Sequence, residues 1–217
     1  MKKTVAYIPI KLVNERLPGK NLKSFDNGEP LLTYILKTAL CVNEFCAVYV
    51  YCSSEEIMSY LPEGVKFLKR PSFLDSSSTT FNDILSEFTK TIDADIYALL
   101  HATAPFITVE TISKAIQAVQ KGNNDSAMTV QKYNAFLWIN GKPLNYDTKI
   151  IPRTQDMEPF YIETTGMYIF TKELTKQSRR VGDNPLLIEV SPIEAIDIDE
   201  PIDFEIANSI FNRVLMQ

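Results

Sequence analysis

A short loop near the start of the chain gathers side chains that bind anions. Lys11, Arg16 and Lys20 follow an apolar run that ends at Ile10, and Gly19 precedes the last of these cations. Lysine is a compact charge suited to phosphate, arginine can bind phosphate oxygens with two donors, and glycine lets a backbone approach a ligand closely. The loop therefore predicts a phosphate site, and we expect it to hold a triphosphate.

The loop lacks the form found in common ATPases. That form needs a glycine five residues before the Gly-Lys pair and a serine or threonine directly after it. This chain has Asn14 and Asn21 at those positions. The alternative interpretation is a solvated loop in which Pro18 and Gly19 only make a turn, and the local residues leave both interpretations open.

Two aspartates near the end of the chain are spaced for metal binding. Asp197 and Asp199 flank Ile198, and alternate side chains of an extended strand point to one face. Two carboxylates on one face suit Mg2+, which also accepts phosphate oxygens of a substrate. The alternative is that Asp199 caps the following helix while Asp197 forms an ion pair. Adjacent like charges cost free energy unless a cation offsets them, which favours the metal.

Buried strands and amphipathic helices alternate along the chain and must position these residues. Such alternation predicts βαβ units in a mostly parallel sheet, whose ligands lie at the carboxyl ends of the strands. We expect strands at 4–10, 47–52, 65–68, 95–100, 126–130 and 161–170, helices at 29–40, 79–92 and 108–120, a helix start at 53–56, and a strand end followed by a helix within 197–216.

One segment interrupts this pattern. Residues 133–160 are rich in turn formers and aromatic side chains and lack a helical period. We expect a hairpin-like arm, acting as a lid or as a subunit contact, inserted in a single domain of residues 1–217. Plain packing at a dimer interface is the simplest role for its aromatic side chains.

Composition argues against several classes of function. The net charge of −5 does not suit nucleic-acid binding, which needs a broad basic face, and no apolar run approaches the length of about 18 residues that crosses a membrane. The cysteines lack Cys-x-x-Cys spacing and His101 is the only histidine, so a zinc site is not expected. We expect a cytoplasmic protein with reduced thiols, no signal peptide, and no membrane or nucleic-acid partner.

The string IPIKLVNERLPGKN at residues 8–21 resembles the N-terminal signature of a known family. These are the cytidylyltransferases that activate 2-keto sugar acids, namely the CMP-sialic acid synthetases and their KDO relatives. The usual form, Ile-Pro-Ala-Arg-Gly-Gly-Ser-Lys-(Gly/Arg)-(Ile/Leu)-Pro-Gly-Lys-Asn, aligns without a gap. Here Lys11 replaces the arginine, Leu12 and Val13 replace the two glycines, and Glu15 stands where a lysine often occurs. The resemblance implies nucleotide contacts from Lys11, Arg16, Lys20 and Asn21.

Further segments resemble the same family in the same order. RPSFLDSSST at 70–79 is similar to the segment near the nucleotide base and ribose, and implies roles for Arg70 and Ser78. LLHATAPFIT at 99–108 is similar to Leu-Gln-Pro-Thr-Ser-Pro-x-Arg, so His101 stands at the glutamine that helps hold the acceptor sugar, and Thr103 matches the threonine. We expect substrate preference to differ where histidine replaces glutamine.

The C-terminal half carries the remaining matches. Residues 151–170 resemble the segment that forms the sugar pocket of a dimer with an arm of the neighbouring subunit, and Thr165 replaces its asparagine. EAIDIDEPIDFEIA at 194–207 is similar to the motif Asp-Ile-Asp-(Thr/Glu)-Pro-x-Asp. These matches imply acceptor contacts from Arg153, Gln155, Glu163 and Tyr168, with Lys142 as a further one.

The resemblance implies a three-layer Rossmann-like nucleotide-diphosphosugar transferase fold with a mostly parallel mixed sheet and a small dimerisation arm. It implies a homodimer that transfers CMP from CTP to the anomeric hydroxyl of a 2-keto-3-deoxy sugar acid, with Mg2+ as cofactor. Lys20, Asp197 and Asp199 would be catalytic, and the two aspartates would hold the metal. The alternatives are a KDO or other sugar-acid nucleotidyltransferase and an inactive nucleotide-binding member of the fold.

Overall fold

A seven-stranded mixed sheet forms the centre of the computed structural model, which describes residues 2–215. The strand order is β3-β2-β1-β4-β8-β5-β9. Only β8 runs antiparallel to its neighbours β4 and β5, so the sheet is mostly parallel, as predicted. The strands are β1 (Thr4–Ile10), β2 (Ala47–Cys52), β3 (Val65–Lys69), β4 (Ile96–Leu100), β5 (Ser126–Tyr133), β8 (Phe160–Thr171) and β9 (Pro185–Glu189).

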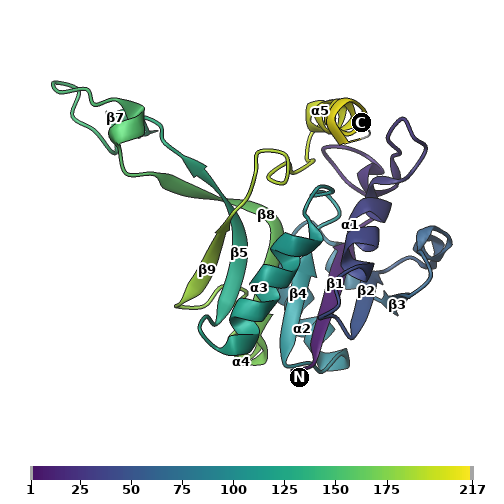
Figure 1. The fold of residues 1–217 in the computed structure, drawn as a ribbon. Coiled ribbons are helices and arrows are strands. Elements are labelled where there is room, and N and C mark those ends of the chain that lie inside the picture. The colour runs from purple at the N-terminus through teal and green to yellow at the C-terminus, as the bar shows by residue number, and fades with distance from the viewer. Residues whose placement is uncertain (1, 216–217) are drawn as a thin grey trace.

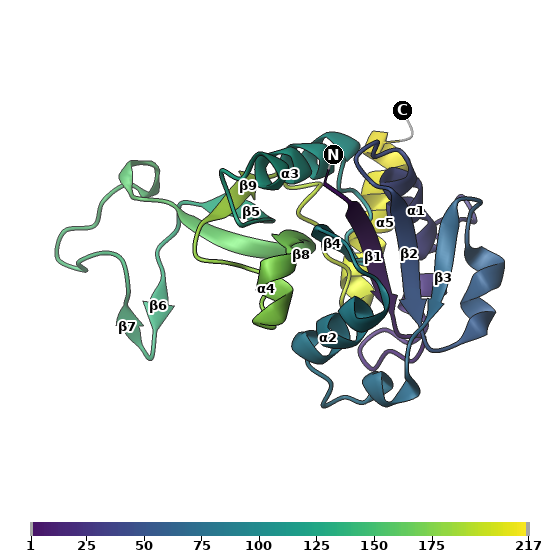
Figure 2. The same cartoon turned by 90° about the horizontal axis from the view of Figure 1, so that it is seen from below.

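Helices cover both faces of this sheet, which gives the predicted three layers. Figure 2 shows α1 (Leu31–Leu40) and α3 (Val109–Lys121) on one face and α2 (Phe81–Thr91) and α4 (Lys172–Lys176) on the other. Because successive side chains of a strand point to opposite faces, each face of the sheet has its own apolar core. In β1, Ala6 and Ile8 pack with α1 and α3, whereas Tyr7 packs with α2, where its ring stacks on Phe88 at 4.3 Å between centroids.

A third apolar cluster fixes the parts of the chain that carry the predicted phosphate loop and aspartates. Leu17 of the loop and Ile198 pack with Phe204 of α5 (Pro201–Ile210), and all three side chains are buried. Figure 1 shows α5 beside the N-terminal loops at the end of the sheet where β1 finishes. The two segments are thereby held together although they lie about 180 residues apart in sequence.

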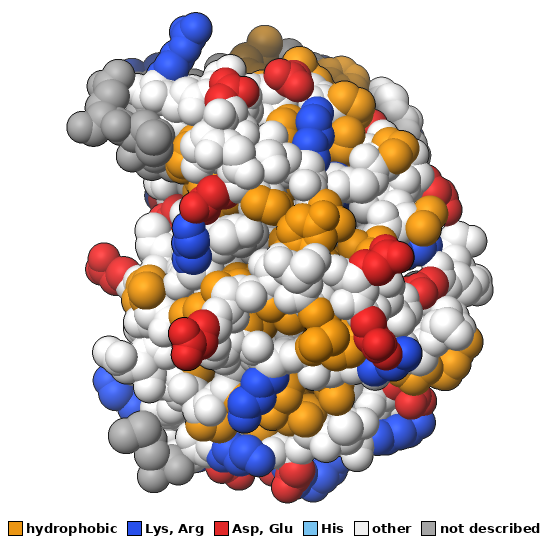
Figure 3. All heavy atoms as spheres, turned by 90° about the vertical axis from the view of Figure 1, so that its right-hand side faces the viewer, with side chains coloured by type: hydrophobic (Ala, Val, Ile, Leu, Met, Phe, Trp, Pro, Cys, Tyr) orange, Lys and Arg blue, Asp and Glu red, His pale blue; other side chains and the backbone are white. Residues whose placement is uncertain are grey.

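The segment 133–160 connects β5 to β8. It contains the short hairpin of β6 (Trp138–Ile139) and β7 (Lys142–Pro143), and it projects away from the sheet (Figure 1). The face on the side of β3 carries acidic, basic and apolar side chains intermixed (Figure 3). Between residues 2 and 215, no helix is long and apolar enough to span a membrane.

Two details of the predicted elements are wrong. Residues 191–200 form an irregular loop in place of the predicted strand end, because the segment is held by tertiary contacts instead of sheet hydrogen bonds. Glu200, not Asp199, is the N-cap of α5 and forms a capping box with Asp203. Pro201 occupies the first turn of that helix, where proline is favoured. The edge strand β9 was not predicted.

Candidate active site

A cavity of about 580 Å³ opens at the carboxyl ends of β1, β3 and β4. Its wall combines the N-terminal loop, the segment after β3, His101 after β4, and a loop after α4. The charged residues in its lining are Lys11, Arg16, Lys20, Arg70, Arg180 and Glu15. Among the described residues the cations outnumber the carboxylate five to one, so the cavity favours an anionic ligand.

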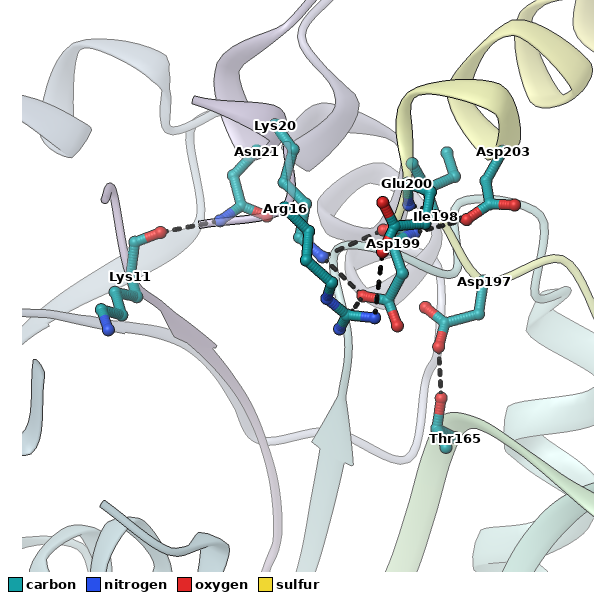
Figure 4. Close-up of polar contacts among 10 residues, drawn as sticks. All are labelled: Lys11, Arg16, Lys20, Asn21, Thr165, Asp197, Ile198, Asp199, Glu200 and Asp203. Carbon is teal, nitrogen blue, oxygen red and sulfur yellow. Dashed lines mark hydrogen bonds and ion pairs between the residues drawn. The ribbon is translucent and has the colours of Figure 1, made fainter. Parts of the chain in front are cut away.

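Gly19 sets the shape of the N-terminal loop. Its φ of 68° is in the left-handed region, which glycine adopts at little cost, and a short 3₁₀ helix follows at Lys20–Leu22. Asn21 is buried, and its Nδ2 donates to the carbonyl of Lys11 at 3.0 Å (Figure 4). Asn21 therefore holds the two sides of the loop together and does not itself line the cavity.

Lys20 joins the loop to the aspartate segment. Its Nζ donates to Oδ1 of Asp199 at 2.8 Å and to the Ile198 carbonyl at 3.0 Å. Nη2 of Arg16 lies 2.9 Å from the same Oδ1 (Figure 4). Burial raises the pKa of Asp199, but the hydrogen bond and charge of Lys20, together with Arg16, outweigh it and lower the pKa overall. Asp199 is thus held ionised and fixes both cations at the cavity.

Asp197 keeps one carboxylate oxygen unused. Its Oδ2 accepts a hydrogen bond from Oγ1 of Thr165 at 2.6 Å (Figure 4), whereas its Oδ1 is buried without a partner among the described residues. An orphaned buried carboxylate oxygen is costly and calls for a ligand. Thr165 has a φ of 58°, which is uncommon for a β-branched residue. It lies where β8 departs from regular register with β5.

Ile198 anchors the segment between the two aspartates. Its side chain is buried, and its N–H donates to the carbonyl of Thr103 at 2.8 Å. Thr103 therefore contributes its backbone carbonyl, and this hydrogen bond ties the segment to the loop that follows β4. The two carboxylates are presented by this anchored loop, so the predicted reason for their placement, alternation along a strand, is wrong.

The predicted base-side residues are only partly in the cavity. Arg70 is buried, lines the cavity and pairs with Asp75, and its Nε has no partner in the described chain. Ser78 lies outside the lining, while Ser77 and Thr79 lie in it. The hydroxyl of Ser78 instead lies 2.8 Å from that of Ser76.

His101 faces the cavity at the end of β4. Its backbone N–H donates to the Gly166 carbonyl at 3.0 Å, and its Nε2 is buried without a partner among residues 2–215. Burial, followed by the charges of Arg180 and Lys20, lowers its pKa from 6.5 to about 4. The imidazole is therefore neutral near pH 7 and can donate and accept hydrogen bonds.

Stability should fall as the pH drops from 6.5 to 5. In this window the unfolded chain binds a proton at His101 and the folded chain does not, so the free energy of unfolding should decrease by about 2 kcal/mol. Urea unfolding at several pH values measures this slope. Because His101 is the only histidine, the His101→Gln variant should lose it, and an equal slope in the variant would contradict the assignment.

The predicted acceptor residues separate into two groups. Tyr168 is buried, and its hydroxyl donates to Oε2 of Glu163 at 2.6 Å near the cavity wall. Arg153 and Gln155 are exposed on the arm, where Arg153 pairs with Asp156 at 2.7 Å. Lys142 lies on β7, also in the arm. Within one chain the structure does not bring these arm residues to the cavity.

Sequence reasoning missed Arg180. It lines the cavity, and its guanidinium lies 3.8 Å from the centroid of the Tyr168 ring and 4.7 Å from that of Phe81. No sequence motif marked it, because its position depends on the path of the loop after α4.

The fold and the cationic cavity define an α/β protein whose strand ends are suited to an anionic ligand. Residues 5–180 match the family model described as cytidylyltransferase. The chain belongs to the cytidylyltransferase family.

Relatives in this family differ in length. N-acylneuraminate cytidylyltransferase A of Danio rerio is 28% identical over 88% of this chain, which spans only 46% of that relative. The chain thus spans about half the length of the vertebrate proteins it matches. CMP-N,N'-diacetyllegionaminic acid synthase of Legionella pneumophila is 25% identical, with 95% of each chain covered.

Solved structures agree on the fold. A CMP:2-keto-3-deoxy-manno-octonic acid synthetase complexed with CTP has a TM-score of 0.75 at 18% identity, with 97% of this chain and 99% of that one covered. A 4-diphosphocytidyl-2C-methyl-D-erythritol synthase from Anaerococcus prevotii has a TM-score of 0.68 at 17% identity. These matches confirm the predicted Rossmann-like architecture of the mixed sheet.

Proposed function

We propose that this protein transfers CMP from CTP to the anomeric hydroxyl of a 2-keto-3-deoxy sugar acid and releases pyrophosphate. The observation that carries the proposal is the pairing of Asp199 with Lys20 and Arg16, two cations that line the cavity. Membership of the cytidylyltransferase family supports the nucleotide, and the names of the relatives support the acceptor.

The reaction would be an in-line displacement at the α-phosphorus of CTP. The anomeric oxygen forms a bond to this phosphorus, and the bond to the oxygen that bridges to the β-phosphorus breaks. Positioning and charge neutralisation carry most of the rate in such reactions. Lys20 and Lys11, on the N-terminal loop, would hold the triphosphate and stabilise the departing pyrophosphate, while Arg70 and the segment 76–79 would lie against the nucleoside.

Mg2+ fits this site as a cofactor. Asp197 Oδ1 is buried without a partner in the described chain, and Asp199 is ionised beside it in sequence. No cluster of three or more metal-binding side chains occurs among the described residues. Two protein carboxylates would suffice for Mg2+ only because this ion completes its shell with water and substrate phosphate. Bound at these aspartates, Mg2+ would neutralise phosphate charge. The hydroxyl proton would pass to Asp197 or to water.

The identity of the acid is tested with a panel. Pyrophosphate release would be measured from CTP, ATP, GTP and UTP with sialic, legionaminic, pseudaminic and KDO acids, with EDTA as the control. We expect release with CTP and one class of acid, abolished by EDTA. CTP binding without release would support the inactive nucleotide-binding alternative. Release with KDO alone would assign the KDO alternative.

The arm supports a homodimer. Its exposed apolar side chains include Phe136, Trp138, Ile139, Leu144, Ile150 and Ile151, and an exposed apolar set of this kind marks an interaction surface. We propose that a second copy of the chain covers it, which would let Arg153 and Gln155 reach the partner's cavity. A cytoplasmic location is part of the proposal, since CTP is supplied there and the free thiols of Cys41, Cys46 and Cys52 stay reduced.

The oligomeric state can be measured directly. Sedimentation equilibrium at micromolar concentration should give twice the chain mass of 24.6 kDa. Trp138→Glu together with Ile151→Asp should give the single-chain mass and a lower rate of turnover, because charges on a buried apolar face oppose association. A wild-type mass of 24.6 kDa would refute the dimer.

A further inference from the structure

Arg180 lines the cavity from a part of the chain other than the N-terminal loop. It belongs to the loop between α4 and β9, and its neighbours are Tyr168 and Glu163 of β8 and Phe81 at the start of α2. Lys11 and Lys20 reach the same cavity after β1. The cavity therefore has one cation on the β8 side, separate from the cations of the phosphate loop.

The loop that carries Arg180 is fixed at its far end. Oδ2 of Asp125 accepts the backbone N–H groups of Asp183 and Asn184 at 2.8 and 3.0 Å. Gly182 makes this approach possible, because a Cβ at that position would lie 2.2 Å from the Asp125 carboxylate. Arg179 adds a hydrogen bond to the Val181 carbonyl at 3.1 Å. These hydrogen bonds hold the backbone of the loop next to Arg180 in place.

The guanidinium of Arg180 keeps donors available. Its face lies on the Tyr168 ring, an arrangement that leaves the N–H groups at the edge unobstructed. Its one ion pair among the described residues is with Oε2 of Glu163 at 4.0 Å, which is beyond hydrogen-bond distance. That oxygen already accepts a hydrogen bond from Tyr168. Among residues 2–215 its side chain donates no hydrogen bond. An arginine placed in this way suits a planar, bidentate carboxylate ligand.

We infer that Arg180 binds the carboxylate of the acceptor sugar acid, an assignment that rests on the proposed cytidylyl transfer. Two features favour the acceptor over CTP. Arg180 contacts Tyr168 and lies beside Glu163, whereas the triphosphate is assigned to the cations of the N-terminal loop. A single guanidinium held against the rings of Tyr168 and Phe81 matches one carboxylate better than a triphosphate. Arg180 then selects for acids over neutral sugars and orients the anomeric hydroxyl toward the phosphorus.

The test compares acids with their methyl esters, which lack the charge. Binding of KDO and of N-acetylneuraminic acid, each with its ester, would be measured by calorimetry in the presence of CTP and EDTA, so that no turnover is needed. The proteins are the wild type, Arg180→Gln, Arg180→Lys, and Lys176→Gln as a control that removes one charge from nearby exposed surface. Thermal unfolding of each variant establishes that it is folded.

The wild type should bind one acid about 10- to 100-fold more tightly than its ester, as expected for a charge-assisted bidentate contact. Arg180→Gln should lose this preference while its affinity for CTP changes less than threefold. Arg180→Lys should retain part of the preference, and Lys176→Gln all of it. If Arg180→Gln does not fold, the acid-over-ester preference is compared between the wild type and Arg180→Lys instead, and a preference that is unchanged in Arg180→Lys would contradict the inference.

Other results would overturn the inference. Weaker CTP binding with an unchanged acid preference would make Arg180 a nucleotide ligand. Equal binding of acid and ester, or no binding of either acid, would refute the inference that Arg180 binds the carboxylate of the acceptor. Arg180-dependent acid binding without pyrophosphate release would leave this inference standing and refute the proposed transfer instead.

Discussion

Replacing Asp199 by asparagine should lower kcat by about 10²- to 10³-fold, the size of effect seen when a charge-stabilising group is removed at a reaction centre. The carboxylate holds Lys20 at 2.8 Å and Arg16 at 2.9 Å, and it is a proposed Mg2+ ligand. An amide of the same size keeps the packing around Ile198 but cannot orient two cations or hold a hard metal ion.

The stability of Asp199→Asn should change little. The carboxylate side chain is about one third exposed, and partly solvated ion pairs contribute on the order of 1 kcal/mol or less. Steady-state pyrophosphate release and urea unfolding would be measured on the same preparation. The matched control is Glu205→Gln, an exposed acid on α5 outside the cavity, which should behave as the wild type. Undiminished turnover by Asp199→Asn would contradict the assigned role.

Replacing Asp197 by asparagine should lower turnover without lowering the stability of the fold. The buried Oδ1 of Asp197 has no partner among the described residues, so an amide of the same size breaks no hydrogen bond there. The remaining oxygen can still accept from Thr165. The variant should therefore be about as stable as the wild type, while turnover falls by about 10²-fold or more because a metal-binding oxygen is lost.

Denaturant unfolding and turnover at several Mg2+ concentrations would check this prediction. The concentration of Mg2+ that gives half-maximal rate should rise in Asp197→Asn and remain unchanged in Glu205→Gln. A large loss of stability with full activity per folded molecule would mean that Asp197 serves the fold alone.

The sequence predicted the strands of the central sheet other than β9, and the helices α1, α2 and α3, because their apolar periods are local properties. It assigned Lys20 and Asp199 to one catalytic site only through the family resemblance of two separate motifs, and it did not predict the ion pair between them. The path that joins them depends on Ile198, which is buried with Leu17 and Phe204. Apolar and acidic side chains alternate at 196–199, a pattern that predicts a strand. The tertiary contact of Ile198 instead holds this segment as a loop.

Arg180 shows the other limit of sequence reasoning. Its role depends on the stack against Tyr168 and on the hydrogen bonds of Asp125 to the loop that follows it. These partners lie 12 and 55 residues earlier in the chain, and nothing in the local residues encodes their contact. The position of Arg153 and Gln155 is a similar case, because an exposed arm acquires its role from what it contacts and not from its own fold.

Phosphorus NMR of the reaction mixture tests the central proposal most directly. With CTP, Mg2+ and the acid that supports pyrophosphate release, we expect the triphosphate signals to be replaced by one phosphodiester signal of the CMP-sugar and by pyrophosphate in equal amounts. Formation of CDP and inorganic phosphate, or unchanged CTP with every acid of the panel, would contradict cytidylyl transfer by this protein.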